Sequence, residues 1–203
     1  MQLHLANYLK TTGHYDSVDL EYYIPRSVLV TGLVNPQVDC PWGSDLYLDL
    51  VVSKDGEYAP IELKYKTKEI ITSYSRFGNV LSNVNVVKNQ SAQDLGRYDF
   101  GKDVRRTELI KQRFNNTVKN GFSIFLTNDK SYQNTPKLGA NYTNFSMNNG
   151  IHGTNMAWLH SNGTTKGHPN FTLNNQYTID WKQIPKNLQN GSQYKFYYTI
   201  VSI

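Results

Sequence analysis

Residues 45–66 have the sequence Asp45-Leu-Tyr-Leu-Asp-Leu-Val-Val-Ser-Lys-Asp-Gly-Glu-Tyr-Ala-Pro-Ile-Glu-Leu-Lys-Tyr-Lys66. This stretch predicts two strands joined by a tight turn, because Asp55-Gly56 is a two-residue signal for a type I′ hairpin. The flanking apolar residues do not follow the strict alternation of a strand with one solvated face, so we expect a largely buried sheet. These apolar residues are Leu48, Leu50, Val51, Val52, Ile61 and Leu63.

The register of this hairpin brings three charged side chains together. Counting outward from the turn places Lys54 opposite Glu57 and Asp49 opposite Glu62, and opposed side chains have Cβ atoms about 4.5–5.5 Å apart. Lys64 is two residues beyond Glu62, so it points to the same face of the sheet. Charged groups on a buried strand are costly unless they are paired or bind a metal, and functional sites are the usual place for them. We therefore expect Asp49, Glu62 and Lys64 to form a site.

The spacing Asp49-x12-Glu62-x-Lys64 resembles that of the PD-(D/E)xK nuclease superfamily, which has the restriction-endonuclease-like fold. In that family a hairpin in the middle of a mixed sheet carries an aspartate on one strand and Glu-x-Lys on the next. Leu48 stands where the family name has proline, as in many members. The alternative interpretation is a surface hairpin with a cross-strand Glu–Lys salt bridge, which would require a clean polar and apolar alternation that these strands lack.

The resemblance implies a Mg²⁺-dependent deoxyribonuclease, and the residue types suit that chemistry. Mg²⁺ prefers oxygen ligands and is usually held by one or two carboxylates plus water and substrate phosphate, so Asp49 and Glu62 would be its ligands. The backbone carbonyl of Ile61 or Leu63 could add a further oxygen, and Mn²⁺ would substitute for Mg²⁺. Lys64 would orient the attacking water or stabilise charge that develops on the phosphate.

Three further residues are candidates for the site. Asp45 is the alternative to Asp49, with the same parity but about 13 Å further along the strand. Glu21 lies in an N-terminal region of weak helical periodicity, and many members of the superfamily carry an acidic residue near the metal on the helix that precedes the hairpin. Gln93, followed by Tyr98, loosely resembles a Gln-x-x-x-Tyr helix motif of some members, with one residue too many. A solvated helix face is the alternative for Glu21.

The segment 67–90 contains no convincing helix or strand pattern. It directly follows the Glu-x-Lys strand, so a lid, a loop that contacts the substrate, or a segment disordered without ligand are all open interpretations. Arg76 and Lys88 within it, and Lys66 just before it, are candidate contacts to DNA phosphates; ordinary solvated charge is the alternative.

Residues 91–119 predict a helix, because Ile110, Phe114 and Val118 form one apolar stripe at spacings of four. Charged residues of this segment, Asp103 and Arg106 among them, are expected on its surface or in a packing network. Residues 122–127 predict a buried strand that follows this crossover helix. The resulting order of helix, three strands, helix and strand is that of the αβββαβ core of the superfamily, so the fold class expected is α/β (mixed α+β) with a central mixed sheet.

The composition changes near residue 130. We expect residues 1–130 to form the nuclease-like core, and residues 131–203 a β-rich C-terminal extension packed on that core within one compact domain. The extension is rich in Asn, Gly, Thr and Tyr and ends in a long strand pattern at 194–203. Its three histidines, at positions 152, 160 and 168, follow no standard zinc-binding spacing.

The net charge, the single cysteine and the lack of long apolar stretches limit the classes of function that this chain can have. The chain has 203 residues, a net charge of +5 and a pI near 9.1, which is compatible with a polyanionic partner such as DNA. Cys40 is its only cysteine, so neither an intrachain disulfide nor a thiolate metal cluster can form. The sequence contains no stretch of about 20 apolar residues, so no membrane partner and a cytoplasmic location are expected. Cutting both strands of a duplex at once would favour a homodimer.

Three hypotheses for the function follow. The first is an Mg²⁺-dependent deoxyribonuclease that hydrolyses phosphodiester bonds, in restriction, phage biology or repair. The second is a nucleic-acid-binding module with the nuclease fold and little or no activity. The third is a β-rich module that recognises glycans, suggested by the Tyr, Trp and Asn residues of the extension.

Overall fold

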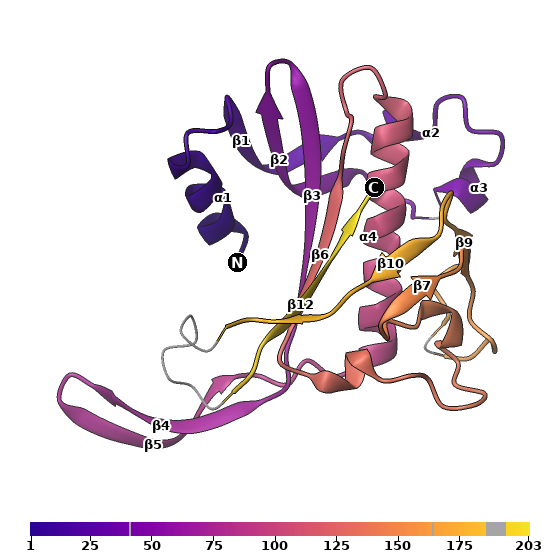
Figure 1. The fold of residues 1–203 in the computed structure, drawn as a ribbon. Helices are drawn as coiled ribbons and strands as arrows, with labels where there is room; N and C mark the ends of the chain where they lie inside the picture. The colour runs from indigo at the N-terminus through magenta and orange to yellow at the C-terminus, as the bar shows by residue number, and fades with distance from the viewer. Residues whose placement is uncertain (41, 164, 186–193) are drawn as a thin grey trace.

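The computed structural model describes residues 1–40, 42–163, 165–185 and 194–203. At its centre lies a mixed sheet of six strands (Figure 1) in the order β1-β2-β3-β6-β12-β11. The strands are β1 (Ser17–Ile24), β2 (Leu46–Lys54), β3 (Glu57–Lys66), β6 (Phe122–Thr127), β12 (Tyr197–Ser202) and β11 (Lys182–Gln183). Strands β3 and β6 run parallel, and the other neighbouring pairs run antiparallel. The expected α/β class with a central mixed sheet is therefore confirmed.

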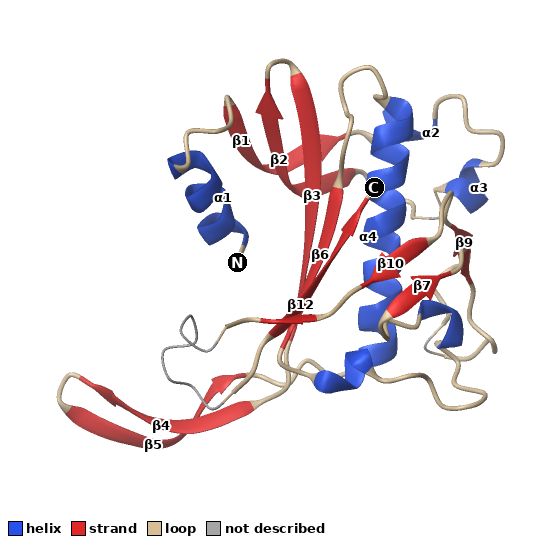
Figure 2. Cartoon of the chain, viewed as in Figure 1, coloured by secondary structure: helices blue, strands red, loops and turns tan. Residues whose placement is uncertain are grey.

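The two longer helices cover opposite faces of this sheet (Figure 2). Helix α1 (Gln2–Thr11) packs Ala6 with Leu50, Val52, Ile61 and Leu63 on one face. Helix α4 (Gln93–Arg113) covers the other face, where its residues pack in two further clusters with the strands. Two short helices, α2 (Arg26–Val30) and α3 (Pro36–Asp39), connect β1 to β2. The sheet is thus buried on both faces at β2 and β3, as the unbroken apolar pattern of the hairpin predicted.

The predicted hairpin has the predicted register. Lys54 pairs with Glu57, and the ladder continues to Leu50 opposite Ile61. At the turn, Asp55 and Gly56 both have positive φ angles, 51° and 79°, as a type I′ turn requires. The parallel pairing of β6 with β3 likewise confirms that residues 122–127 return to the sheet after a crossover helix.

Helix α4 is shorter than predicted, since it begins at Gln93 and ends at Arg113 instead of spanning residues 91–119. The apolar stripe nevertheless packs together: Ile110, Phe114 and Val118 belong to one cluster with residues of β1, β2 and α2. Val118 reaches this cluster from an extended segment that forms a bridge with Tyr58, not from a helix. Apolar spacing alone could not distinguish these two ways of filling the same space.

Two segments were predicted wrongly. The weak helical periodicity of residues 1–30 belongs to α1 and the short α2 only, and β1 lies between them, so Glu21 is on a strand and not on a helix. The segment 67–90 is not a structureless loop, because β4 (Ile70–Arg76) and β5 (Asn79–Val87) pair as an antiparallel hairpin that projects from the body (Figures 1 and 2). Val, Ile and Tyr in this segment favour strands, but the Ser and Asn residues between them make the strand pattern hard to recognise in the sequence.

The C-terminal third packs on α4 through a large aromatic cluster. It contains the short elements η1 (Lys130–Gln133), η2 (Thr143–Phe145), β7 (Gly150–His152), β8 (Asn155–Met156), β9 (Phe171–Thr172) and β10 (Tyr177–Ile179). Tyr98 of α4 is stacked on Trp158 at 5.4 Å between ring centroids and meets Phe145 and Phe171 edge-on. The last strand, β12, enters the central sheet beside β6. The C-terminal residues therefore complete the sheet as well as covering α4.

Candidate active site

Strands β2 and β3 part at the position of Asp49. Continuing the ladder beyond Leu50 and Ile61 would pair Leu48 with Leu63, so that the N–H of Leu63 would reach a backbone carbonyl. This N–H instead donates to Oδ2 of Asp49 at 2.6 Å. The other carboxylate oxygen accepts from the side-chain amide of Gln2 at the start of α1. The two hydrogen bonds fix the Asp49 carboxylate at the opening between the strands.

The neighbouring strand β1 is also irregular at this level. Leu20 pairs with Leu50 and Tyr22 with Leu48, which places Glu21 across from Asp49. Glu21 has a φ of 49°, in the left-handed region that non-glycine residues rarely adopt. It is exposed to solvent. The ladder between β2 and β3 ends at Leu50 and Ile61, one position before Asp49 and Glu62.

Glu62 and Lys64 face α4, where two residues of that helix complete a buried charge cluster. The ammonium Nζ of Lys64 lies 3.0 Å from Oδ2 of Asp103. The guanidinium of Arg106 lies 3.5 Å from Oδ1 of Asp103 and 3.8 Å from Oε1 of Glu62. We use the name buried charge cluster for these four residues. Its two carboxylates and two cations alternate across the interface between β3 and α4, so their charges balance.

Two members of this cluster have incomplete hydrogen bonding, Glu62 at Oε1 and Arg106 at Nε. The side chain of Glu62 is 3% exposed, and its buried Oε1 has no hydrogen-bond partner within the described residues. Burial, followed by the charges of Asp103 and Asp49, raises the pKa of Glu62 well above its ordinary value, against the opposing effect of Arg106 and Lys64. An unsatisfied buried carboxylate oxygen is costly, and a bound cation is one way to compensate it.

The pKa values of Asp103 and Lys64, two other members of the cluster, are also shifted. Burial raises the pKa of Asp103, although the positive charges of Lys64 and Arg106 oppose this effect. Burial lowers the pKa of Lys64, but the carboxylates of Asp103, Asp99 and Glu62 outweigh it, so that the net shift is upward. Lys64 is therefore held as an ammonium ion, the form that stabilises negative charge on a phosphate.

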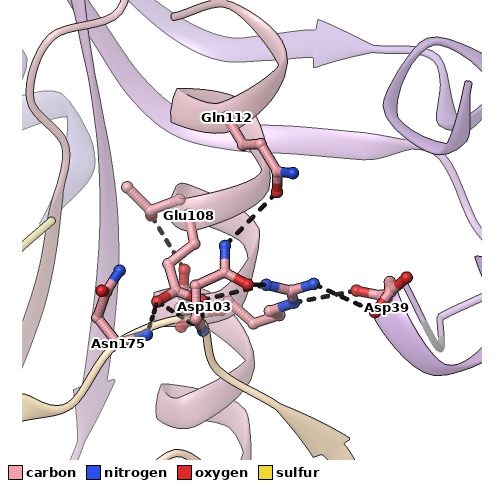
Figure 3. Close-up of polar contacts among 8 residues, drawn as sticks. Asp39, Asp103, Glu108, Gln112 and Asn175 are labelled. Atoms are coloured by element: carbon pink, nitrogen blue, oxygen red, sulfur yellow. Dashed lines mark hydrogen bonds and ion pairs between the residues drawn. The ribbon is translucent and has the colours of Figure 1, made fainter. Parts of the chain in front are cut away.

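A second buried carboxylate, Glu108 one helical turn further along α4, shows what a purely structural arrangement looks like (Figure 3). Its two oxygens accept hydrogen bonds from the backbone N–H groups of Asn174 and Asn175 at 2.9–3.0 Å. Arg105 pairs with it at 3.3 Å and reaches Asp39 of α3 at 3.8 Å. The backbone hydrogen bonds of Glu108 tie α4 to the segment at Asn174, whereas Oε1 of Glu62 has an ion pair with Arg106 but no hydrogen-bond partner among the described residues.

The donor set limits which metal the site could hold. Within the described ranges, no group of three or more His, Cys, Asp or Glu side chains is gathered closely enough to hold a metal ion alone. Zn²⁺ in a structural site needs four protein ligands, whereas Mg²⁺ is commonly bound through one or two carboxylates with water and phosphate. The carboxylates of Asp49 and Glu62 therefore fit Mg²⁺ or Mn²⁺, with Asp49 close enough for its charge to act on Glu62.

Two other candidates lie outside this site. Gln93, the first residue of α4, donates to Asp129 at 2.6 Å, and ten residues of helix separate it from Asp103, about 15 Å along the axis. Tyr98, its companion in the motif, is buried and donates to the carbonyl of Pro169. The structure therefore brings neither residue to the buried charge cluster. Gln93 instead links the start of the helix to Asp129.

Asp45, the alternative to Asp49, has a different role. It accepts hydrogen bonds from the backbone N–H of Arg26 at 2.8 Å and from the hydroxyl of Tyr23 at 3.0 Å. These two bonds, the backbone one first, lower the pKa of Asp45. Asp45 thus secures the chain at the start of α2 and at the far end of β2, away from Glu62.

The candidate DNA contacts follow β3 outward from the site. Lys66 ends β3, two residues beyond Lys64 on the same face. Lys88 is exposed just after β5, and Arg76 lies at the far end of β4, where its guanidinium covers the ring of Tyr74 at 4.4 Å. These residues border the projecting hairpin, not the carboxylates.

Three residues of the site were not selected from the sequence. Gln2, Asp103 and Arg106 contact Asp49, Lys64 and Glu62, but two of them were assigned to a helix surface or a packing network. An Asp and an Arg three residues apart on a helix, like Asp103 and Arg106, are a common pattern. Only the placement of α4 over β3 shows that these two residues contact Lys64 and Glu62.

Comparison with family models, with curated proteins and with solved structures gives no match for this chain. Over the part of the chain that is described, no helix is long and apolar enough to cross a membrane.

Proposed function

We propose that this chain is an Mg²⁺-dependent deoxyribonuclease of the PD-(D/E)xK type. The observation that carries the proposal is the Glu62 carboxylate, which is buried, has an unsatisfied oxygen, and lies where β2 and β3 part around Asp49. The order of α1, the strands β1, β2 and β3, α4 and then β6 agrees with the αβββαβ core expected for this superfamily. The hairpin that carries the two carboxylates also lies inside a mixed sheet.

Each member of the site has a distinct task in this proposal. Asp49 and Glu62 would hold the metal, which supplies an activated water and neutralises charge on the scissile phosphate. Lys64 stabilises the negative charge that develops on the phosphate as the water attacks phosphorus and the ester oxygen leaves. Asp103 holds the ammonium of Lys64 in place at 3.0 Å. Arg106 balances the negative charge of Glu62 and Asp103 in the metal-free protein.

A specific observation favours one alternative, a nucleic-acid-binding module with the same fold and little activity. In the buried charge cluster, Lys64 and Arg106 already neutralise Asp103 and Glu62, so the cluster is electrically complete without a metal. The glycan-binding alternative is less well supported, because Trp158, Phe145 and Phe171 of the extension lie inside its core, and sugar-binding platforms need exposed aromatic rings.

The deciding experiment measures metal-dependent cutting together with metal binding. Supercoiled plasmid is incubated with the wild-type protein in Mg²⁺, Mn²⁺ or EDTA, and Mn²⁺ binding is followed by calorimetry. We expect nicking with either metal, none in EDTA, and loss of both cutting and Mn²⁺ binding in Glu62→Gln. The control Glu57→Gln changes an exposed glutamate of the same strand and should behave as wild type.

The outcomes separate the hypotheses. DNA binding without cutting in any metal would refute the nuclease and support the inactive module. Equal Mn²⁺ binding by Glu62→Gln and wild type would show that the metal, if any, lies elsewhere.

A further inference from the structure

The hairpin formed by β4 and β5, residues 70–87, projects from the body as an arm (Figures 1 and 2). It is inserted between β3, which carries Glu62 and Lys64, and α4. Its base is closed by two hydrogen bonds of 2.7 Å, from Gln90 N to the carbonyl of Thr67 and from the Thr67 hydroxyl to the carbonyl of Lys88. The arm therefore starts from the same strand as the proposed catalytic residues and is fixed in place at its root.

The surface of the arm is unusually apolar for a hairpin in solvent. A lone two-stranded hairpin is marginally stable in water, and exposed apolar patches mark interaction sites. Five of its large apolar side chains are exposed: Ile71, Phe77, Val80, Leu81 and Val86. A partner that covers these side chains would account for their retention.

The tip carries the clearest sign of function. Phe77 and Gly78 form the turn, with φ angles of 52° and 81°. Such turn positions favour Gly, Asn or Asp, and a bulky residue with positive φ is strained. The ring of Phe77 is fully exposed, so it packs against none of the residues that the structure describes. Neither the turn nor the core explains a phenylalanine at this position, whereas contact with a ligand would.

The charges around the arm indicate what that ligand is. Residues 70–87 contain no acidic side chain, and Arg76, beside Phe77, is their single charged residue. Lys66, Lys68 and Lys88 surround the base together with one acidic residue, Glu69, which accepts a hydrogen bond from Asn85 of β5, so the charge of these four residues is net positive. The positive charge at the root and at the tip of the arm is complementary to the phosphates of a polyanion. The uncharged residues between them suit a groove that presents hydrogen-bonding and methyl groups.

We propose that the arm docks in the major groove of duplex DNA, the class of substrate that the site would cut; this inference rests on the proposed function. The major groove is about 12 Å wide and admits a two-stranded β-ribbon, whose strands lie about 4.8 Å apart. The nine residues of β5 span about 30 Å, close to one turn of the duplex. Lys66, Lys68 and Lys88 contact phosphates on the rim of the groove.

Within the groove, the arm offers the chemistry that base edges recognise. Asn79 and Asn83 expose amide groups, which donate and accept hydrogen bonds at base edges. The Phe77 ring at the tip contacts a thymine methyl group, an apolar contact of the major groove. Arg76 lies beside it and reaches either a guanine edge or a phosphate. Single-stranded DNA lacks this groove, so the arm selects duplex over single strand.

The test compares duplex with single-stranded DNA in EDTA, where no cutting occurs. Fluorescence anisotropy is measured at one fixed low salt concentration with a labelled duplex of about 30 base pairs and with one of its strands alone. We expect Phe77→Asn to weaken duplex binding roughly tenfold and to leave single-strand binding unchanged. Asparagine suits the turn better than phenylalanine, so the melting temperature should not fall. The control Leu138→Asn changes another fully exposed apolar residue, outside the arm, and should bind as wild type.

Three results would overturn the proposal: no duplex binding by the wild type, equal duplex affinity of Phe77→Asn and wild type, or an equal loss with Leu138→Asn. A fourth result would also overturn the proposal: sedimentation showing a dimeric wild type and a monomeric Phe77→Asn variant that still binds DNA. That result would assign the arm to contact with a second copy of the chain. Plasmid cutting is scored separately. Arm-dependent duplex binding by a wild type that cuts nothing would refute the nuclease and still support the arm.

Discussion

The backbone N–H of Leu63 donates to the carboxylate of Asp49 across the gap between β3 and β2, at 2.6 Å. A side chain thus occupies a position that a backbone carbonyl holds in a regular antiparallel ladder. The hydrogen bond links the two strands where their ladder ends, and from this position the charge of Asp49 acts on Glu62. Asp49 therefore has a structural task and, in the proposed nuclease, a metal-binding task, and the two can be separated by mutation.

The first prediction separates these two tasks of Asp49. Asp49→Asn keeps an oxygen that can accept from Leu63 but loses the negative charge. Asp49→Ala removes the acceptor as well, which leaves a partly buried N–H unsatisfied at a cost of about 1–2 kcal/mol. We expect both variants to lose Mn²⁺ binding and DNA cutting, and only Asp49→Ala to lower the free energy of unfolding clearly in urea denaturation. Equal stability of the two variants would contradict the role of this hydrogen bond.

The second prediction concerns pH. The folded state raises the pKa of Glu62, and also that of Asp103, so the folded protein binds more protons than the unfolded chain above the ordinary pKa of a carboxylic acid. The free energy of unfolding must therefore fall as the pH rises from about 4.5 through the raised values, by about 1.4 kcal/mol for each pH unit and each extra proton held.

The pH effect is measured by urea denaturation between pH 4.5 and 8 in EDTA, for wild type and Glu62→Gln. The variant cannot ionise at this position, so its stability should decline less steeply. A wild-type curve that rises over this range would contradict the burial of an unsatisfied Glu62. Adding Mn²⁺ should flatten the wild-type curve, because a bound cation favours the ionised carboxylate.

The hairpin and its partner strand could be predicted from sequence because local signals determine them. Asp55-Gly56 fixes the turn, and the turn fixes the register by counting, which is why Lys54 lies opposite Glu57. The apolar run 122–127 predicts a strand for a similarly local reason. By contrast, the arm was missed because Phe77 stands where a turn residue would normally signal a hairpin.

The complete site could not be predicted, because it depends on how distant segments meet. The pairing of Lys64 with Asp103 requires that one particular turn of α4 lie over β3, and rotation of the helix by one residue would direct Asp103 elsewhere. Gln2 reaches Asp49 only because α1 crosses the opposite face of the sheet. Glu21 was expected on a helix but lies on β1. The left-handed backbone of Glu21 itself interrupts this strand, which pattern analysis cannot foresee.

The third prediction assigns Lys64 to catalysis and not to binding. Lys64→Ala should still bind Mn²⁺ through Asp49 and Glu62, and should still bind DNA. It should nick supercoiled plasmid roughly 100-fold more slowly, because it lacks the charge that stabilises the transition state. The control Lys54→Ala removes an exposed lysine at the turn of the same hairpin. Cutting by Lys64→Ala at the wild-type rate would exclude this lysine from the mechanism.

The last prediction contrasts the two buried glutamates. Glu108 accepts hydrogen bonds from Asn174 and Asn175 and pairs with Arg105, so Glu108→Ala removes one partner of a buried guanidinium and leaves two backbone N–H groups without their acceptor. We expect this variant to lose about 3 kcal/mol of unfolding free energy, as a broken buried ion pair does. Mn²⁺ binding and plasmid cutting, measured well below its lowered melting temperature, should match those of the wild type. Glu62→Gln should show the reverse pattern, with stability retained and both activities lost. If Glu108→Ala lost metal binding while still folded, Glu108 and not Glu62 would be the carboxylate of the active site.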